Sequence, residues 1–98
     1  MARLFAVMRS RGTGWDKLRS MEQQKDWHSH AQFMNALQAE GFVLLGGPLE
    51  GTNDVLLIIR AQDADHIKAR LAGDPWSNNG LLATKEILPW TIRLGSLG

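Results

Sequence analysis

The sequence predicts one α+β domain, spanning residues 1–98, whose elements follow the order strand, helix, strand, strand, helix, strand. Three observations favour this order. An amphipathic segment ends at Gly41 and leads directly into the unbroken apolar run of residues 42–45. A second apolar run, residues 55–59, follows a connection rich in turn formers. Apolar segments of strand length also stand near both ends of the chain.

The first strand is expected at residues 3–9, where apolar side chains occupy both faces. The pattern is lost over residues 10–25, a longer connection than most between neighbouring elements. We interpret this connection as a binding or lid loop with one turn of helix near residues 21–24. The alternative is a plain surface excursion in which Trp15 folds back and fills space.

The first helix is expected from Asp26 to Gly41, because glycine suits the left-handed position past a helix end. At about 100° per residue, His30 falls on the apolar stripe of this helix. The other members of the stripe are Trp27, Ala31, Met34 and Leu37. His28 falls on the polar shoulder instead, so His30 is the histidine that we consider for chemistry.

The remaining elements follow from turn and cap signals. Residues 46–53 are dense in turn formers and predict an antiparallel hairpin between the second and third strands. Asp63 is a favourable N-cap for a second helix. Pro75 suits the start of a short helical turn. The last strand is expected at residues 81–94, with Pro89 marking an edge position or a bulge.

Composition narrows the classes of function. The chain has no cysteine, so no disulfide, thiolate zinc site or cysteine nucleophile is available. Its net charge is +1 with no basic run, so we expect no nucleic-acid partner. No segment reaches the roughly 18 apolar residues of a membrane span, and we find no leader. We therefore expect a cytoplasmic protein without membrane attachment.

This order of elements is the split βαβ arrangement of ferredoxin-like domains, with both helices on one face of a four-stranded antiparallel sheet. The strands nevertheless carry apolar residues on both sides. Exposing several of them would cost about 1.5–3 kcal/mol each. We therefore expect a homodimer in which sheet packs against sheet into a shared barrel-like core that frames the ligand cleft. The alternative is a monomer with an apolar patch.

Three segments carry a further pattern, which reads WHSHAQFM at 27–34, EGFVLLGGPL at 40–49 and LAGDPW at 71–76. Together they resemble the YCII-related family, a group within the dimeric α/β-barrel proteins, over nearly the whole chain. The resemblance implies a ferredoxin-like subunit, a dimer, and a histidine–aspartate active site that maps to His30 and Asp74. The activity attributed within the family is acid–base elimination on a small ring, such as dehydrochlorination of a chlorinated hydroxyhydroquinone. The long loop and the Trp-rich motif depart from shorter members and leave the substrate class open.

Under this hypothesis His30 moves a proton and Asp74 orients the imidazole through its other nitrogen. The alternative is a core histidine bonded to a helix-capping aspartate. Arg9 and Arg11 are candidates to hold a substrate anion, with a solvated strand end as the alternative.

Aromatic residues complete the predicted site. Trp27 and Trp76, with Phe33, are expected to line a pocket, and Trp15 is expected to hold the ring of the ligand; plain core packing is the alternative. We expect no metal, because histidines two apart on a helix point away from each other, and no cofactor.

Three classes of function remain open at this point. The first is a dimeric enzyme of lyase or isomerase type acting on a small cyclic or aromatic anion. The second is a non-catalytic ligand-binding or accessory protein that uses the same cleft. The third is a purely structural dimer module.

Overall fold

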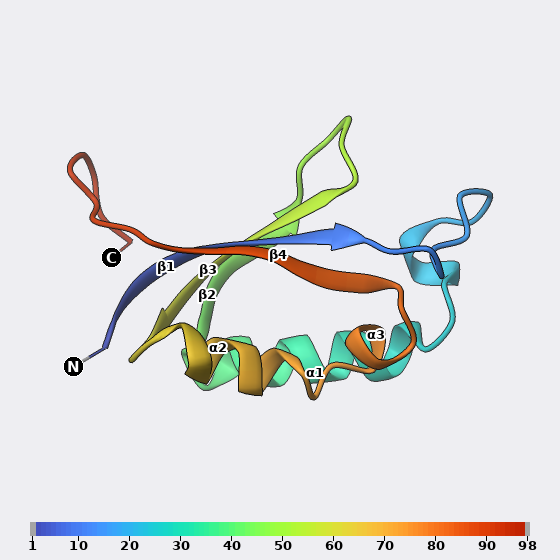
Figure 1. Ribbon diagram of the computed structural model, residues 1–98, viewed down its shortest axis with the longest axis horizontal. Coiled ribbons are helices and arrows are strands. Elements are labelled where there is room, and N and C mark those ends of the chain that lie inside the picture. The colour runs from blue at the N-terminus through green and yellow to red at the C-terminus, as the bar shows by residue number, and fades with distance from the viewer. Residues whose placement is uncertain (1, 98) are drawn as a thin grey trace.

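The computed structural model describes residues 2–97 and has an α+β, ferredoxin-like fold (Figure 1). The predicted order of elements is confirmed, and the short helical turn expected at Pro75 is present. The elements are β1 (Arg3–Arg11), α1 (Trp27–Ala39), β2 (Val43–Pro48), β3 (Asp54–Ala61), α2 (Ala64–Leu71), α3 (Pro75–Asn78) and β4 (Leu82–Pro89).

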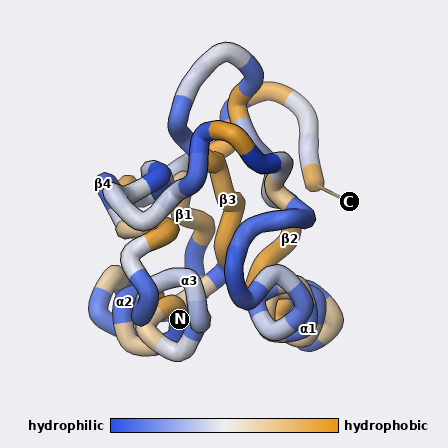
Figure 2. Tube along the Cα trace, turned by 90° about the vertical axis from the view of Figure 1, so that its right-hand side faces the viewer, coloured by the Kyte–Doolittle hydropathy of each residue, from blue (hydrophilic) through white to orange (hydrophobic). Residues whose placement is uncertain are grey.

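The four strands form one antiparallel sheet in the order β2-β3-β1-β4. All three helices lie on the same side of this sheet, as two views at right angles show (Figures 1 and 2). The hairpin turn between β2 and β3 and the segment after β4 rise on the other side. The molecule therefore has two layers, one of helices and one of strands, as the sequence predicts. Within residues 2–97, none of the helices has the length and apolar character needed to cross a bilayer.

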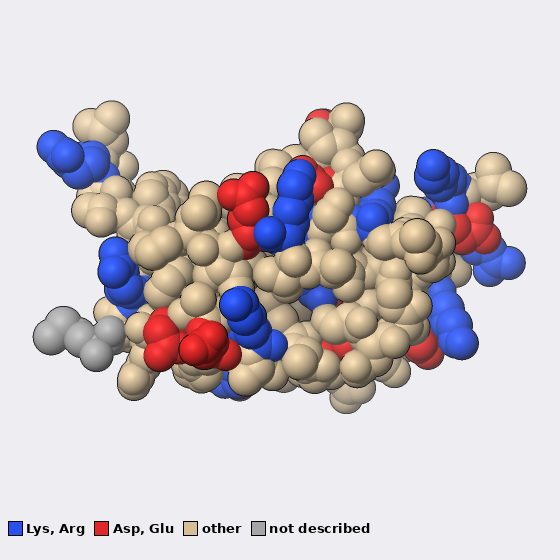
Figure 3. Space-filling view, in the orientation of Figure 1, with Lys and Arg blue, Asp and Glu red and all other residues tan. Residues whose placement is uncertain are grey.

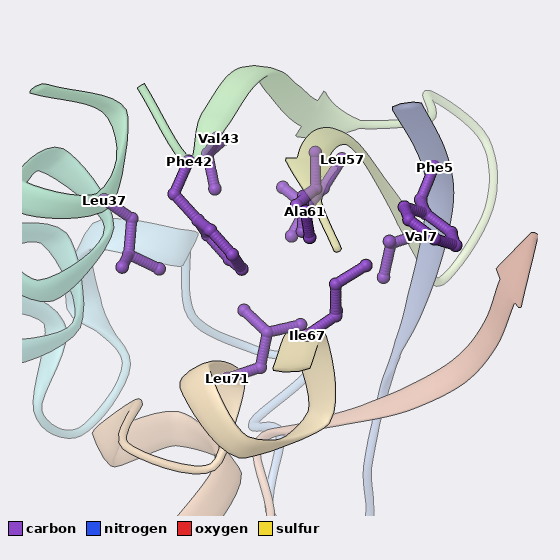
Figure 4. Close-up of a cluster of buried hydrophobic side chains, with 10 residues drawn as sticks. Phe5, Val7, Leu37, Phe42, Val43, Leu57, Ala61, Ile67 and Leu71 are labelled. Carbon is purple, nitrogen blue, oxygen red and sulfur yellow. The ribbon is translucent and has the colours of Figure 1, made fainter. Parts of the chain in front are cut away.

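The core fills the space between the two layers. Val7 of β1 pairs with Leu57 of β3, and both side chains point toward the helices. Figure 4 shows Ile67 and Leu71 of α2 directed at these strands from below. Fully burying one such side chain contributes about 1.5–3 kcal/mol to folding, so the alternation of side chains along β1 and β3 decides which face receives the helices.

The strand bounds differ from those predicted. β1 runs on to Arg11 and β3 covers Asp54–Ala61, and the largest differences lie in β4 and β2. The last strand ends at Pro89 and not at residue 94. Pro89 has no N–H to donate, and its partner strand β1 is near its own start, so a single bond from Trp90 N to Leu4 O closes the ladder. β2 continues through Gly46 and Gly47, which the sequence assigned to the turn.

Close packing explains why glycine stands at position 46. A Cβ added to Gly46 would lie 2.6 Å from Cδ2 of Leu57, whereas one added to Gly47 would meet nothing within 4 Å. Gly46 therefore lets the edge strand approach the buried Leu57 side chain, and it serves the strand and not a turn.

The connection from β1 to α1 is structured, with the predicted turn of helix present as a 3₁₀ turn at Met21–Gln23. Gln24 is buried and fastens the loop. Its Oε1 accepts from the backbone N–H of Asp16 at 3.0 Å, and its Nε2 donates to the carbonyls of Asp16, Arg19 and Ser20. One side chain thus holds residues 16–20 in place.

The face of the sheet opposite the helices carries a row of apolar residues, with Arg60 and Glu86 on the same side. The strand register places Leu45, Ile58, Ala6 and Leu88 in one row across the four strands. At the two ends of this row, Leu45 is 55% and Leu88 is 49% exposed, and Trp90 beyond the row is 41% exposed. We call this surface, made of these five residues, the open face.

Candidate active site

His30 and Asp74, 44 residues apart in sequence, meet beneath the sheet. His30 lies in the first turn of α1 and Asp74 is the N-cap of α3. Nδ1 of His30 lies 2.8 Å from Oδ1 and 3.0 Å from Oδ2 of Asp74. The helical spacing that places His30 on the apolar stripe also aims it at this carboxylate. The contact is thus present, while a catalytic role for the pair stays a prediction.

Arg9 is the second partner of Asp74. Its Nη1 donates to Oδ2 of Asp74 at 2.7 Å, and its Nη2 donates to Oγ of Ser77 at 2.6 Å. Arg9 is 1% exposed and Asp74 is fully buried, so the solvated strand end that we considered for Arg9 is wrong. Alternation along β1 turns Arg9 inward with Val7, and its guanidinium is committed to protein partners.

The buried carboxylate of Asp74 remains ionised. Burial alone would raise its pKa, but hydrogen bonds from His30, from Arg9 and from the backbone N–H of Trp76 outweigh this penalty and hold the pKa below its ordinary value of 3.8. A charge is tolerated here because each carboxylate oxygen accepts at least one donor.

Three tryptophans surround the pair. Trp76 stacks on the His30 ring, with the ring centroids 3.7 Å apart and an interplanar angle of 6°. Trp27 is tilted against both rings, and Trp15 meets Trp76 edge to face at 5.4 Å. Trp76 is itself almost fully buried, and its Nε1 donates to the Lys25 carbonyl at 2.6 Å. Stacking and the Asp74 contact together restrict the imidazole to one orientation.

A cleft of about 390 Å³ opens beside His30, between α1, the helix-facing side of the sheet and the β1–α1 loop. Six predicted site residues line it, namely Arg9, Arg11, Trp15, Trp27, His30 and Trp76. Asp74 lies behind them. The residues of one chain already line this cleft, and the expectation that an assembly of two subunits frames it stays a prediction.

The second nitrogen of His30 faces the cleft. Nε2 makes no hydrogen bond within residues 2–97, and Arg9 Nε is the sole fully buried side-chain N or O atom described there without a partner. Nε2 therefore keeps some accessible surface, and because His30 lines the cleft we infer that this surface opens into it. An ionised carboxylate only accepts hydrogen bonds, so Nδ1 carries the proton toward Asp74. In the neutral imidazole, Nε2 then presents its lone pair to a ligand.

Arg11 is the cation of the cleft that has no acidic partner. Its guanidinium carbon lies 4.3 Å from the centre of the Trp15 ring, and within the described chain its side chain makes no ion pair. Arg9, in contrast, is neutralised by Asp74. Of the two arginines that we expected to meet an anion, Arg11 is therefore the one with an uncommitted charge.

Other residues depart from the sequence-based picture. Phe33 does not line the cleft but packs against the core, where its ring fills the space beside Gly73. His28 is exposed on the polar side of α1. Sequence reasoning missed Met21 and the glycine pair of β2 as lining residues of the cleft, and Gln24 as the residue that fastens the loop. An isolated glutamine in a charged loop carries no signal of burial. Two adjacent glycines are more typical of a turn than of a strand that lines a cleft.

A search of the described residues for three or more His, Cys, Asp or Glu side chains that could share a metal ion finds no such group.

Comparisons with known proteins bear on the fold and the family. A family model described as the YCII-related domain matches residues 7–91. Among solved structures, the chain is similar to 5-chloro-2-hydroxyhydroquinone dehydrochlorinase from Burkholderia phenoliruptrix AC1100 in complex with 2,5-dihydroxybenzoquinone. The TM-score is 0.62 and the identity 20%, over 94% of this chain and 95% of that chain. At this identity the likeness shows the fold alone. No curated protein matches the chain.

Proposed function

The chain belongs to the YCII-related family, and we propose that it is an acid–base enzyme of lyase or isomerase type that acts on a small cyclic or aromatic anion. One observation carries the proposal. His30 presents Nε2 to an aromatic-lined cleft while a buried, ionised carboxylate holds its Nδ1. This is the arrangement that a positioned general base requires.

In the proposed reaction, Nε2 of His30 takes a proton from a ring carbon or hydroxyl of the substrate. The electron pair of the broken bond moves into the ring. It then either expels a leaving group from the neighbouring carbon, which is elimination, or recaptures the proton at another position, which is isomerisation. Asp74 stabilises the imidazolium that forms in between, since the two oxygens beside Nδ1 carry the compensating charge.

The surroundings of His30 support this chemistry. Trp27, Trp15 and Met34 make much of the cleft wall apolar, and exclusion of water strengthens the interaction between imidazolium and carboxylate. Arg11 lies where it can attract an anionic substrate oxygen. The fold neighbour is named as a dehydrochlorinase and was solved with a quinone, which favours a planar, oxygenated ring as the ligand here.

We further propose that two copies of the chain associate through the open face. Its row of apolar side chains crosses all four strands, and large exposed apolar patches mark association surfaces. A second copy offers an identical apolar surface, as twofold symmetry requires. We expect this homodimer in the cytoplasm.

The proposal is tested by proton exchange, which needs no knowledge of the final product. Wild-type protein is incubated in D₂O with a panel of substituted hydroquinones and cyclic diketones, and deuterium incorporation is followed by NMR. We expect incorporation into at least one ring by the wild type and by His28→Ala, whose side chain is exposed, and a loss of about 10²–10⁴-fold in His30→Ala.

The outcome separates the enzyme from the ligand-binding alternative. Full exchange by a folded His30→Ala protein would end the assignment of His30 as the base. Tight binding of a ring compound without exchange in any variant would favour the non-catalytic ligand-binding or accessory protein.

A further inference from the structure

A second, smaller hollow of about 230 Å³ lies next to the cleft, between the β1–α1 loop and the hairpin turn at Asn53. Three side chains line both spaces, namely Arg11, Trp15 and Met21. A ligand in the cleft therefore has the hollow as its immediate neighbour, with the Arg11–Trp15 pair between the two.

The hollow is cationic. Arg11, Lys17 and Arg19 line it. Within the described residues, the sole ion pair that these three make joins Arg19 Nε to Asp16 at 3.2 Å. The Asp16 carboxylate also accepts from the backbone N–H of Leu18. Two positive charges are thus left without a carboxylate partner. Figure 3 shows basic side chains at the end of the molecule where this loop lies, with acidic side chains among them.

The loop that carries these charges is held in one shape. The four hydrogen bonds of Gln24 reach Asp16, Arg19 and Ser20, and Ser20 N donates to the Gln23 side chain. Lys17 stands within the segment fastened by these bonds, so the backbone that carries its charge is held in place beside the hollow. Unpaired cations on a fixed loop, next to an apolar cleft, form a site for an anion attached to a ring.

We propose that the hollow binds the anionic arm, a carboxylate or a phosphate, of the compound whose ring lies in the cleft. The substrate class is then a small ring with a short acidic side arm. This inference rests on the proposed function for the identity of the ring site. It assigns the long β1–α1 loop to recognition of the arm, with Arg11 and Lys17 as specificity-determining residues.

The test compares an anionic probe with a neutral counterpart, in two pairs of compounds. Binding of 4-hydroxyphenylacetate and of its neutral amide, 4-hydroxyphenylacetamide, is measured by calorimetry and by tryptophan fluorescence at low and raised salt, and phenyl phosphate is compared with phenol. We expect each anion to bind more tightly than its neutral counterpart, by a factor that shrinks as salt rises. The larger of the two preferences identifies carboxylate or phosphate as the arm.

Substitution localises the effect. Lys17→Gln should weaken the anionic probe by about threefold, the size expected for one exposed ion pair, and Lys17→Glu, which reverses the charge, should weaken it by about tenfold. Neither change should affect the amide. Lys68→Gln, an exposed lysine on α2, is the matched control and should bind both probes as the wild type does.

Equal affinity for acid and amide, absence of binding by either, or an unchanged preference in both loop variants would overturn the proposal. The proposed function fails separately. If His30→Ala and wild type both lack proton exchange yet keep the preference for acid over amide, the anion site stands without the catalytic assignment.

Discussion

At the scale of single residues, the site depends on Asp74, whose carboxylate accepts hydrogen bonds from two buried side chains, the Arg9 guanidinium and the His30 imidazole. It accepts from Arg9 on one side and holds His30 on the other. Removing its charge leaves Arg9 buried without compensation, and breaking a buried pair in this way costs about 3–5 kcal/mol. The residue that orients the proposed base is thus also a large contributor to folding.

This dual role predicts how stability depends on pH. The pKa of Asp74 is lowered in the folded protein, so its contribution is fully present above its unfolded value of 3.8 and is lost as pH falls through the lower, folded value. We expect urea denaturation to show stability falling below about pH 4. In Asp74→Asn, stability at neutral pH should be lower by about 3–5 kcal/mol and its decline in acid shallower.

Asp63→Asn is the control, since asparagine also caps a helix and Asp63 is exposed. Its pH dependence should follow that of the wild type. An equally steep decline in Asp74→Asn and wild type would show that other carboxylates govern acid unfolding.

The predictability of these residues from sequence was uneven for physical reasons. His30 could be found because helix geometry fixes which residues share a face. Asp74 was identified by resemblance, since an aspartate before proline signals an N-cap whether or not a histidine lies nearby. The inward direction of Arg9 follows from strand alternation with Phe5 and Val7, but the favourable water contacts of arginine argued against burial. Its partner, 65 residues away, is not visible in local sequence.

At the scale of elements, β2 shows how a strand can be misassigned to a turn. Apolar periodicity predicts the helices and the buried strands, because the residues that face the core recur at a fixed spacing along each of them. Strand ends depend on the partner strand, which is why β4 stops at Pro89 and β2 runs on through its two glycines. The requirement for glycine at position 46 comes from Leu57, which lies on the neighbouring strand.

The glycine pair offers a matched test. Gly46→Ala should destabilise the protein by about 1–3 kcal/mol, the cost of overpacking, since its Cβ would lie 2.6 Å from the buried Leu57 side chain. Gly47→Ala meets nothing within 4 Å and should be neutral or slightly stabilising. Thermal unfolding of the two variants measures the difference. Equal unfolding temperatures would mean that Leu57 moves aside without cost.

At the scale of the whole molecule, the open face carries exposed apolar side chains that no described element of the chain covers. Leu45 and Leu88 stand near its two edges and are about half exposed. The helices cannot cover them, because every described helix lies on the other side of the sheet. A second copy packed on this surface would remove Leu45, Leu88 and Trp90 from water, whereas Ile58 in the middle of the row is already buried at 6% exposure.

Sedimentation tests this assembly. The wild type should sediment as a dimer, whereas Leu45→Glu or Leu88→Glu should give monomers, because a carboxylate would be buried against an apolar partner. Leu18→Glu is the control, since Leu18 is 96% exposed and lies in the β1–α1 loop, away from the sheet. A wild-type monomer at high concentration would contradict the proposed dimer.

The alternation of β1 has one further consequence. Arg9 projects toward the cleft while its neighbour Met8 projects toward the open face, so the same strand separates catalysis from association. Each subunit would own a complete, outward-facing reaction centre. When wild-type subunits are mixed with an excess of His30→Ala subunits, the activity per wild-type subunit should therefore stay unchanged. The inactive subunit should not inhibit its wild-type partner.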